Sequence, residues 1–500
     1  MVLEARVKNI NLNTFYECAI ISKSLARKLN VREGDRIKVR KRFSEKVYIV
    51  DIDNDNEIVK DDQIGIPKKY SSFKDNDVVM LRVTNPPKSK EIIKKKIEGY
   101  ELSKRDIRLL ISDVYHRRLS NIEIASYLTA VKINGMTIKE IYYVTQEMYK
   151  YGDIISWPWH WKIVDKHSIG GIPGNRTTPI VVSIVAAAGL KIPKTSSRSI
   201  TSPAGTADTI EVLADVCFSI DEIKRIVSKT NGCMVWGGAL DLAPVDDIFI
   251  QIEKPLNLDP EGQVIASILS KKKSVGSKYV LIDIPYGDEA KIEEFNKAKI
   301  LADKFKIVGA YLGMRVESII TKGSSPIGSG VGPVLEMIDV LNVLYGKGSR
   351  DLREKSLEMA GILLNIAGKG DYNTAKYILE SGKAFKKFKE IIEAQNGSVN
   401  KSLIDMLGRH TYEVKASQDG IVEKISNSSI AEIAKRAGAP SFKGAGVWLF
   451  KRVGDKVKKG ETLFKIYAES ERKLDYALDV VKENPPFLLS KKDSFIVMER

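Results

Sequence analysis

The alternation of strand-like and helical segments between residue 166 and about residue 400 constrains the fold of this chain more than any other feature. Residues 279–284 are mostly apolar and have the length of a buried strand. Residues 288–305 predict a helix, and Val308 and residues 316–321 predict further strands. Because parallel strands need crossover connections that are usually helical, this order predicts an α/β domain with a mostly parallel sheet.

Regions with other patterns lie on both sides of this predicted domain, 166–400. Residues 1–84 contain short β-branched runs and predict a small N-terminal β-rich domain. Residues 89–165 predict a helical domain, in which Thr137-Ile-Lys-Glu140 has the spacing of a capping box. Residues 412–500, with glycines at turn positions, predict a C-terminal α+β domain with a role in assembly. A chain of 500 residues exceeds a single core, so a multidomain α/β protein is expected.

The composition excludes several classes of function. The net charge is +16, but the lysines are spread along the chain without an RNA-binding or zinc-finger motif, so no nucleic-acid partner is expected. No apolar run reaches the roughly 18 residues of a membrane helix, and the N-terminus lacks the order of a signal peptide. The three cysteines form no CxxC pair and the four histidines are far apart. We therefore expect no metal site and a reducing, cytoplasmic location.

One glycine-rich loop has the composition of an anion site. A strand-like segment leads into Lys166–Gly171, and Thr178-Pro179 predicts the start of the next helix, with Thr178 as its cap. Paired glycines let backbone N–H groups face one concavity, and a helix start adds free donors. Lys166 adds a full positive charge and Ser168 a hydroxyl. The loop matches neither GxxxxGK[ST] nor GxGxxG, so the residues alone leave a plain glycine turn as the alternative.

A second loop, residues 195–208, is crowded with hydroxyl side chains and also carries Arg198. Thr206 is predicted to cap the helix that begins there. Hydroxyls and an arginine suit a phosphate group. A solvated loop is the alternative, but a second loop of phosphate-binding composition within about 30 residues of the first argues against it.

These motifs resemble those of the thymidine and pyrimidine-nucleoside phosphorylase family. The Lys166 loop, segment 195–211 and segment 265–272 stand in the family's order, and the similarity is greatest to the archaeal branch, the AMP phosphorylases, which also has a β-rich N-terminal domain. The resemblance implies that inorganic phosphate, as co-substrate, cleaves a nucleoside 5′-monophosphate into free base and ribose 1,5-bisphosphate. It further implies AMP as the leading substrate, CMP and UMP as others, no cofactor, a role in nucleotide salvage or degradation, and a homodimer or larger homo-oligomer.

The resemblance also implies a set of binding residues. The attacking phosphate would be held by Lys166, Ser168, Ser197 and Thr206. The nucleotide would be bound by Gly171, Ser197, Arg198, Ser199, Ile200, Thr201, Ser202, Thr206, Ser267, Lys271 and Lys291. Ser267 and Lys271 are four residues apart and would share one face of a helix.

Two side chains are candidates for the acid that protonates the leaving base. Asp259 matches the proton donor proposed for AMP phosphorylases, and it needs burial to raise its pKa if it is to donate near neutral pH. Capping a helix before Pro260 is its alternative role. His167 falls where thymidine phosphorylases have a histidine proposed to aid catalysis.

Three other functions stay open on the sequence. Ile252 stands where thymidine phosphorylases have a nucleoside-contacting arginine, which favours a 5′-phosphorylated substrate over the second hypothesis, an ordinary pyrimidine-nucleoside phosphorylase. An enzyme like anthranilate phosphoribosyltransferase, similar in fold and phosphate loop, would need magnesium, and we find no clustered acidic pair beside a phosphate loop. A nucleotide-sensing or nucleic-acid-binding scaffold without turnover is the alternative outside the enzymes.

Overall fold

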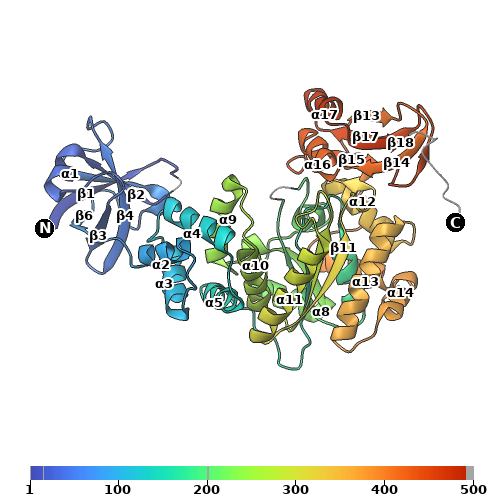
Figure 1. Ribbon diagram of the computed structural model, residues 1–500, viewed down its shortest axis with the longest axis horizontal. Helices are drawn as coiled ribbons and strands as arrows, with labels where there is room; N and C mark the ends of the chain where they lie inside the picture. Colours follow the sequence, from blue (N-terminus) through green and yellow to red (C-terminus); the bar gives the residue numbers. More distant parts are fainter. Residues whose placement is uncertain (1, 15, 200–201, 491–500) are drawn as a thin grey trace. The chain divides into compact units, whose positions relative to one another are not determined.

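Figure 1 shows the computed structural model, which describes residues 2–14, 16–199 and 202–490. The chain forms two compact units, of which unit 1 comprises Met1–Tyr151 and Ala243–Ser270, and unit 2 comprises Gly152–Leu242 and Lys271–Arg500. Unit 1 thus includes a segment from the middle of the range 166–400, and the four domain ranges stay predictions.

Unit 1 begins with a closed β-barrel in the strand order β1-β5-β2-β4-β3-β6 (Figure 1). In β1 the alternation is clear, because Ala5 and Val7 are buried and Arg6 and Lys8 are exposed. This barrel confirms the β-rich N-terminal region. Its elements are β1 (Val2–Ile10), β2 (Cys18–Ser22), α1 (Lys23–Leu29), β3 (Arg36–Lys41), β4 (Ser44–Asp53), β5 (Gln63–Pro67), the short 3₁₀ helix η1 (Lys68–Tyr70) and β6 (Val78–Val83).

The rest of unit 1 is helical. The capping box predicted at Thr137 is confirmed, because Thr137 accepts a hydrogen bond from the backbone of Glu140 and the Glu140 carboxylate accepts one from the backbone of Thr137. Ile252, which the sequence placed at a specificity position, lies in the helical core and is 8% exposed. The helices are α2 (Ser89–Ile97), α3 (Lys104–Tyr115), α4 (Asn121–Asn134), α5 (Ile138–Tyr149), α9 (Pro244–Leu256) and α10 (Glu261–Ser274), whose end from Lys271 onwards belongs to unit 2.

Unit 2 contains the expected parallel sheet. Strands β7 (Val164–Ser168), β10 (Tyr279–Tyr286) and β11 (Arg315–Lys322) lie in the order β11-β10-β7, and all pair in parallel. A second parallel pair joins β8 (Ile192–Ser196) to β9 (Gly232–Trp236). The register places Asp283 of β10 opposite Ser168 of β7. The prediction of an α/β region with a mostly parallel sheet is therefore confirmed.

Helices pack around these strands (Figure 1). Helix α6 is buried on every side from Thr177 to Ala186, which matches its long apolar run. The helices of this region are α6 (Thr177–Ala187), α7 (Thr206–Ile210), α8 (Ile220–Thr230), α11 (Phe295–Tyr311), α12 (Pro333–Leu344), α13 (Arg350–Ile366), α14 (Tyr372–Glu380) and α15 (Lys383–Ala394), with short 3₁₀ helices η2 (Gly237–Ala239) and η3 (Ile404–Met406).

Two predictions about local structure are wrong in this region. The helix expected over 288–305 is α11, which starts at Phe295, because the chain after β10 first turns at Gly287 with φ 143° and makes an isolated β-bridge from Tyr286 to Ile292. Val308 was expected in a strand, but it lies three residues after Phe305 on the buried face of α11.

The expected cap of α6 is also wrong. The helix begins at Thr177 and its N-cap is Arg176, so Thr178 lies inside the first turn and Pro179 is not the first helical residue. Gly189, with φ 86°, follows the end of this helix.

The C-terminal part of unit 2 combines antiparallel sheets with two helices. Strand β12 precedes α12 in the α/β region, yet it pairs with β15 of this part. The elements are β12 (Gly330–Val331), β13 (His410–Lys415), β14 (Gly420–Ile425), α16 (Asn427–Arg436), β15 (Gly446–Leu449), β16 (Lys456–Val457), β17 (Thr462–Ala468), α17 (Glu471–Glu483) and β18 (Phe487–Ser490). Within the described residues, no helix is long and apolar enough to cross a membrane.

Candidate active site

Strand β7 carries charged side chains on both of its faces. Successive side chains of a strand point to opposite faces, so Asp165 and His167 lie on one face and Lys166 and Ser168 on the other. Asp165 and Lys166 are 0% and 2% exposed. Charged side chains that are buried this deeply need partners, and each face of β7 has its own cluster of partner side chains.

The first cluster, which we call the Asp283 cluster, surrounds a buried carboxylate on β10. Ser168 Oγ donates to Asp283 Oδ2 at 2.8 Å, and Thr321 Oγ1 donates to Oδ1 at 2.8 Å. Lys355 on α13 places its Nζ 2.9 Å from Asp283 Oδ2. Burial opposes ionisation of Asp283, but Lys355 and Lys166 outweigh it and lower the pKa of this carboxyl below its usual value.

Lys166 is the second cation of the Asp283 cluster. Its Nζ donates to Thr177 Oγ1, at 2.7 Å, in the first turn of α6. Burial lowers the pKa of Lys166 to about 7, and Lys194 and Lys355 add repulsion, while Asp283 only partly offsets these effects. An anion bound beside Lys166 would supply the charge that the protein itself does not provide.

The second cluster, which we call the Asp165 cluster, lies on the opposite face of β7. Lys272 Nζ is 2.7 Å from Asp165 Oδ2, and Lys194 Nζ is 3.5 Å from Asp165 Oδ1. Burial also lowers the pKa of Lys194 to about 7. Burial, and after it Lys272 and Lys194, lower the pKa of His167 well below 6.5. His167 is therefore neutral at neutral pH, and a neutral imidazole is a poor acid for the leaving base.

Together the two clusters hold more lysines than aspartates. Four lysines face two aspartates, namely Lys166, Lys194, Lys272 and Lys355 against Asp165 and Asp283. All six side chains are at least nine-tenths buried. A bound anion would compensate the lysines in excess of the two aspartates.

The glycine loop between β7 and α6 contains three glycines with positive φ. Gly170, Gly171 and Gly174 have φ values of 87°, 97° and 71°, which only glycine adopts readily. A Cβ atom at Gly171 would lie 3.4 Å from both Cγ and the backbone nitrogen of Lys291. The structure thus places Lys291, which is exposed, beside the glycine loop.

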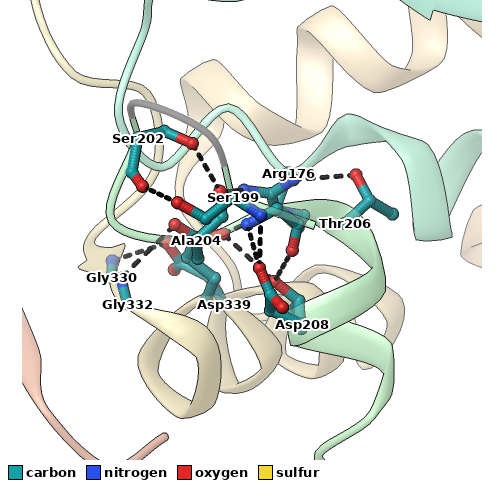
Figure 2. Close-up of polar contacts among 12 residues, drawn as sticks. Arg176, Ser199, Ser202, Ala204, Thr206, Asp208, Gly330, Gly332 and Asp339 are labelled. Carbon is teal, nitrogen blue, oxygen red and sulfur yellow. Dashed lines mark hydrogen bonds and ion pairs between the residues drawn. The ribbon is translucent and has the colours of Figure 1, made fainter. Parts of the chain in front are cut away.

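Arg176 connects the glycine loop with the hydroxyl-rich loop (Figure 2). Its Nη1 donates to Thr206 Oγ1 at 2.8 Å and its Nη2 donates to the carbonyl oxygen of Ala204 at 2.9 Å. Its Nε also pairs with buried Glu336 on α12. Thr206 was expected to cap α7, but it is the first residue of the helix and the N-cap is Gly205, whose backbone N–H donates to Asp208. The Thr206 hydroxyl accepts from Arg176.

Asp208, which lies in α7, holds the hydroxyl-rich loop by hydrogen bonds to its backbone. Its carboxylate accepts the backbone N–H of Ser199 at 2.7 Å and that of Gly205 at 2.8 Å (Figure 2). Ser202 Oγ donates to the carbonyl oxygen of Ala204 at 2.9 Å. Ile200 and Thr201 lie outside the described residues.

Arg198 is paired with carboxylates of α7 and of the C-cap of that helix. It forms two hydrogen bonds to Glu211, at 2.8 and 2.6 Å, and one to Asp208 at 3.2 Å. Its guanidinium lies 4.8 Å from the ring centre of Trp236. Neighbouring Ser197 is exposed, and its carbonyl oxygen accepts from the backbone of Ala207. A substrate contact by Arg198 therefore has to coexist with this pairing.

The other predicted residues lie on or near α10. Asp259 is exposed, and its carbonyl oxygen accepts from Lys132 Nζ at 3.1 Å within unit 1. Ser267 Oγ donates to Asp246 Oδ2 at 2.7 Å, also within unit 1. Lys271 is half-buried at the point where α10 enters unit 2. Among the described residues, no group of His, Cys, Asp and Glu side chains could hold a metal ion.

Comparison with known proteins identifies the domains and the family. Residues 90–152 match the helical bundle domain of a glycosyl transferase family, residues 160–258 match its a/b domain, and residues 421–487 match the pyrimidine nucleoside phosphorylase C-terminal domain. The chain is 42% identical to the AMP phosphorylase of Natronomonas pharaonis, with 100% of both chains covered. It is 44% identical to that of Thermococcus kodakarensis, with 97% of both covered. The chain belongs to the AMP phosphorylase family.

This membership confirms the resemblance drawn from the loops at Lys166 and 195–211. A third relative, the AMP phosphorylase of Methanocaldococcus jannaschii, is 42% identical over 96% of each chain. In structure, the chain is similar to anthranilate phosphoribosyltransferase from Thermus thermophilus, with a TM-score of 0.51, 16% identity, and coverage of 61% of this chain and 99% of the other. This likeness shows a shared fold.

Sequence reasoning missed several residues of the two clusters. Asp283 stood out only as a charged residue inside the apolar run 279–284, a signal that could have been used, because a charge in a buried strand needs partners. Lys355 gave no signal, since it lies among other charged residues at the start of an amphipathic helix. The missed residues are Asp165, Arg176, Thr177, Lys194, Lys272, Asp283, Thr321, Glu336 and Lys355.

Proposed function

We propose that this protein cleaves nucleoside 5′-monophosphates with inorganic phosphate, converting AMP and phosphate into adenine and ribose 1,5-bisphosphate, with CMP and UMP as further substrates, in nucleotide salvage or degradation. The observation that carries the proposal is a group of four buried lysines that face only two buried aspartates at β7, next to the glycine loop. Membership of the AMP phosphorylase family supports the choice of a nucleoside monophosphate.

The reaction replaces one bond at C1′ of the ribose. A phosphate oxygen attacks C1′, the bond from C1′ to the base nitrogen breaks, and its electron pair leaves with the base, which takes up a proton. The sugar passes through an oxocarbenium-like state, as in glycoside hydrolysis. A phosphate fixed in line with that bond lowers the entropic part of the barrier.

In this proposal, Lys166, Ser168, Ser197 and Thr206 hold the attacking phosphate. Lys166 contributes charge, because a bound phosphate raises the lowered pKa of this side chain and so favours its ammonium form. Ser168 donates its only hydroxyl proton to Asp283 in the empty site, so it has to turn that proton toward the phosphate when it binds. Thr206 accepts from Arg176, which leaves its own hydroxyl proton for a phosphate oxygen.

The nucleotide contacts are proposed by resemblance and supported by local geometry. Lys291 lies beside Gly171, so its side chain begins next to the glycine loop. The backbone of Ser199 is fixed by Asp208, which preorganises the loop that contains Arg198 and Ser202. Residues Ile200, Thr201, Ser267 and Lys271 are assigned by resemblance alone.

Asp259 is the preferred acid for the leaving base. The neutral imidazole of His167, surrounded by buried lysines, gives up a proton poorly. Asp259 is exposed, so the burial that a carboxylic acid needs to donate near neutral pH has to come with the bound substrate. We propose no cofactor for the reaction, and a homodimer or larger homo-oligomer assembled through the C-terminal part.

One assay tests the proposed function. The full-length protein is incubated with inorganic phosphate, without added metal, and with AMP, CMP, UMP, adenosine or uridine in turn, and release of the base is followed. We expect base from the monophosphates and a phosphorylated sugar in equal amount. Release from adenosine or uridine but not from the monophosphates would instead identify a nucleoside phosphorylase, and AMP binding without release would identify a scaffold.

A further inference from the structure

The buried carboxylate of Asp283 has two lysines within reach of its electric field. Asp283 is 0% exposed, and Lys355 and Lys166 are 7% and 2% exposed. In an interior of low dielectric, a carboxylate attracts the nearest ammonium strongly and is costly to leave uncompensated. One lysine is enough to compensate the charge of Asp283.

The geometry divides the two lysines between different partners. Lys355 Nζ is 2.9 Å from Asp283 Oδ2 and 3.1 Å from Thr321 Oγ1. Lys166 Nζ instead donates to Thr177 Oγ1 at 2.7 Å. Lys355 comes from α13 and Lys166 from β7, so the two ammonium groups approach the carboxylate from different elements.

We propose that Lys355 is a positioning residue, which neutralises Asp283 and so leaves the ammonium of Lys166 available for the attacking phosphate. The inference rests on the proposed function, since it concerns the phosphate of that reaction. Lys355 acts through Asp283 and Lys166 and need not touch the phosphate itself. In the empty site, the same carboxylate also accepts hydrogen bonds from Ser168 and Thr321.

Removing Lys355 would change the partner of Lys166. Asp283 would then face one cation only, and Lys166 would turn from Thr177 toward the carboxylate. An incoming phosphate would have to compete with Asp283 for that ammonium. The other charged groups that face Lys166, Lys194 on β8 and Arg176 before α6, are themselves paired with carboxylates and cannot take over the role of Lys355.

Direct binding of inorganic phosphate to the full-length protein tests this inference, with calorimetry at neutral pH. We expect Lys355→Met to raise the Kd for phosphate by at least about tenfold, and the double variant Asp283→Asn/Lys355→Met to return it to within about threefold of the unsubstituted protein. Asp283→Asn alone should bind phosphate at least as tightly as the unsubstituted protein, because no carboxylate competes. Exposed Lys369 provides a matched control, and Lys369→Met should change nothing.

Each outcome supports or overturns the inference. An unchanged Kd in Lys355→Met overturns it, and so does a double variant as weak as Lys355→Met, since that result would make Lys355 a direct phosphate ligand. If Lys355→Met does not fold, Asp283→Asn and the double variant still test the inference. A tenfold rise in the Kd for phosphate in either of them contradicts competition by Asp283.

Steady-state kinetics separates positioning from a general structural role. Lys355→Met should raise KM for phosphate by at least about tenfold and leave KM for AMP within about twofold, whereas loosening of the whole site would raise both. A protein that binds phosphate as expected but releases no base from AMP would overturn the proposed function and leave the inference about Lys355 intact.

Discussion

Phosphate binding is expected to draw a proton from solution onto Lys166. In the empty site, burial lowers the pKa of Lys166 from its ordinary value of 10.5 to about 7. At about pH 8, roughly nine-tenths of this side chain is therefore neutral, and a phosphate dianion held against it favours the charged form. For phosphate that is already a dianion, the expected uptake by Lys166 at about pH 8 is about 0.9 proton per site.

A bound phosphate that returned the pKa of Lys166 from about 7 to its ordinary 10.5 would contribute about 5 kcal/mol through this side chain. The affinity for phosphate falls as the pH rises, because the bound form carries more protons than the free form between pH 7 and the pKa of Lys166 in the complex. Affinity for phosphate should therefore fall about tenfold per pH unit above about pH 7.

The proton uptake can be measured by calorimetry in two buffers with different ionisation enthalpies. The difference between the observed binding enthalpies gives the number of protons exchanged. Lys166→Met should bind phosphate weakly and take up close to none, and Lys369→Met should match the unsubstituted protein. No uptake by the unsubstituted protein at about pH 8, or full uptake by Lys166→Met, would refute the assignment of this proton to Lys166.

Three further predictions follow from the structure. Asp259→Asn should lower kcat for AMP by at least about a hundredfold, and His167→Asn by less than about tenfold, because His167 is already neutral; a larger loss in His167→Asn would reverse the assignment. Gly171→Ala should raise KM for AMP, since φ is 97° there and the added Cβ meets a neighbour at 3.4 Å. Glu140→Gln should destabilise unit 1 by about 3 kcal/mol, measured by urea unfolding, because the ammonium of Lys96, 2.8 Å away and buried, loses its charged partner.

The fold was predictable where its causes are local. The buried apolar run of β10, the strand predicted over 316–321 and the capping box at Thr137 are short-range patterns, and the structure reproduces them. The start of α11 was missed because the chain first turns at Gly287. The cap of α6 was missed because the helix already begins at Thr177, with Arg176 as its N-cap. Such boundaries depend on tertiary partners as much as on helix propensity.

The candidate site was predictable only in part, for a related reason. The glycine loop and the hydroxyl-rich loop are continuous in sequence, so their composition points to an anion directly. Asp283 and Lys355 are 72 residues apart, and only the packing of α13 near β10 brings them together. The partner of Thr206 was also unpredictable, because its hydroxyl accepts from Arg176, which is 30 residues away in the sequence.

The alternation of side chains along β7 explains why one short segment serves two tasks. Lys166 and Ser168 face the Asp283 cluster, where the proposed phosphate is bound, while His167, between them, faces the Asp165 cluster. Because each cluster holds two lysines and one aspartate, both sides of the strand favour an anion and disfavour a protonated imidazole. A site whose lysines become charged as an anion enters favours phosphate over neutral water, which is the discrimination that phosphorolysis needs and hydrolysis does not.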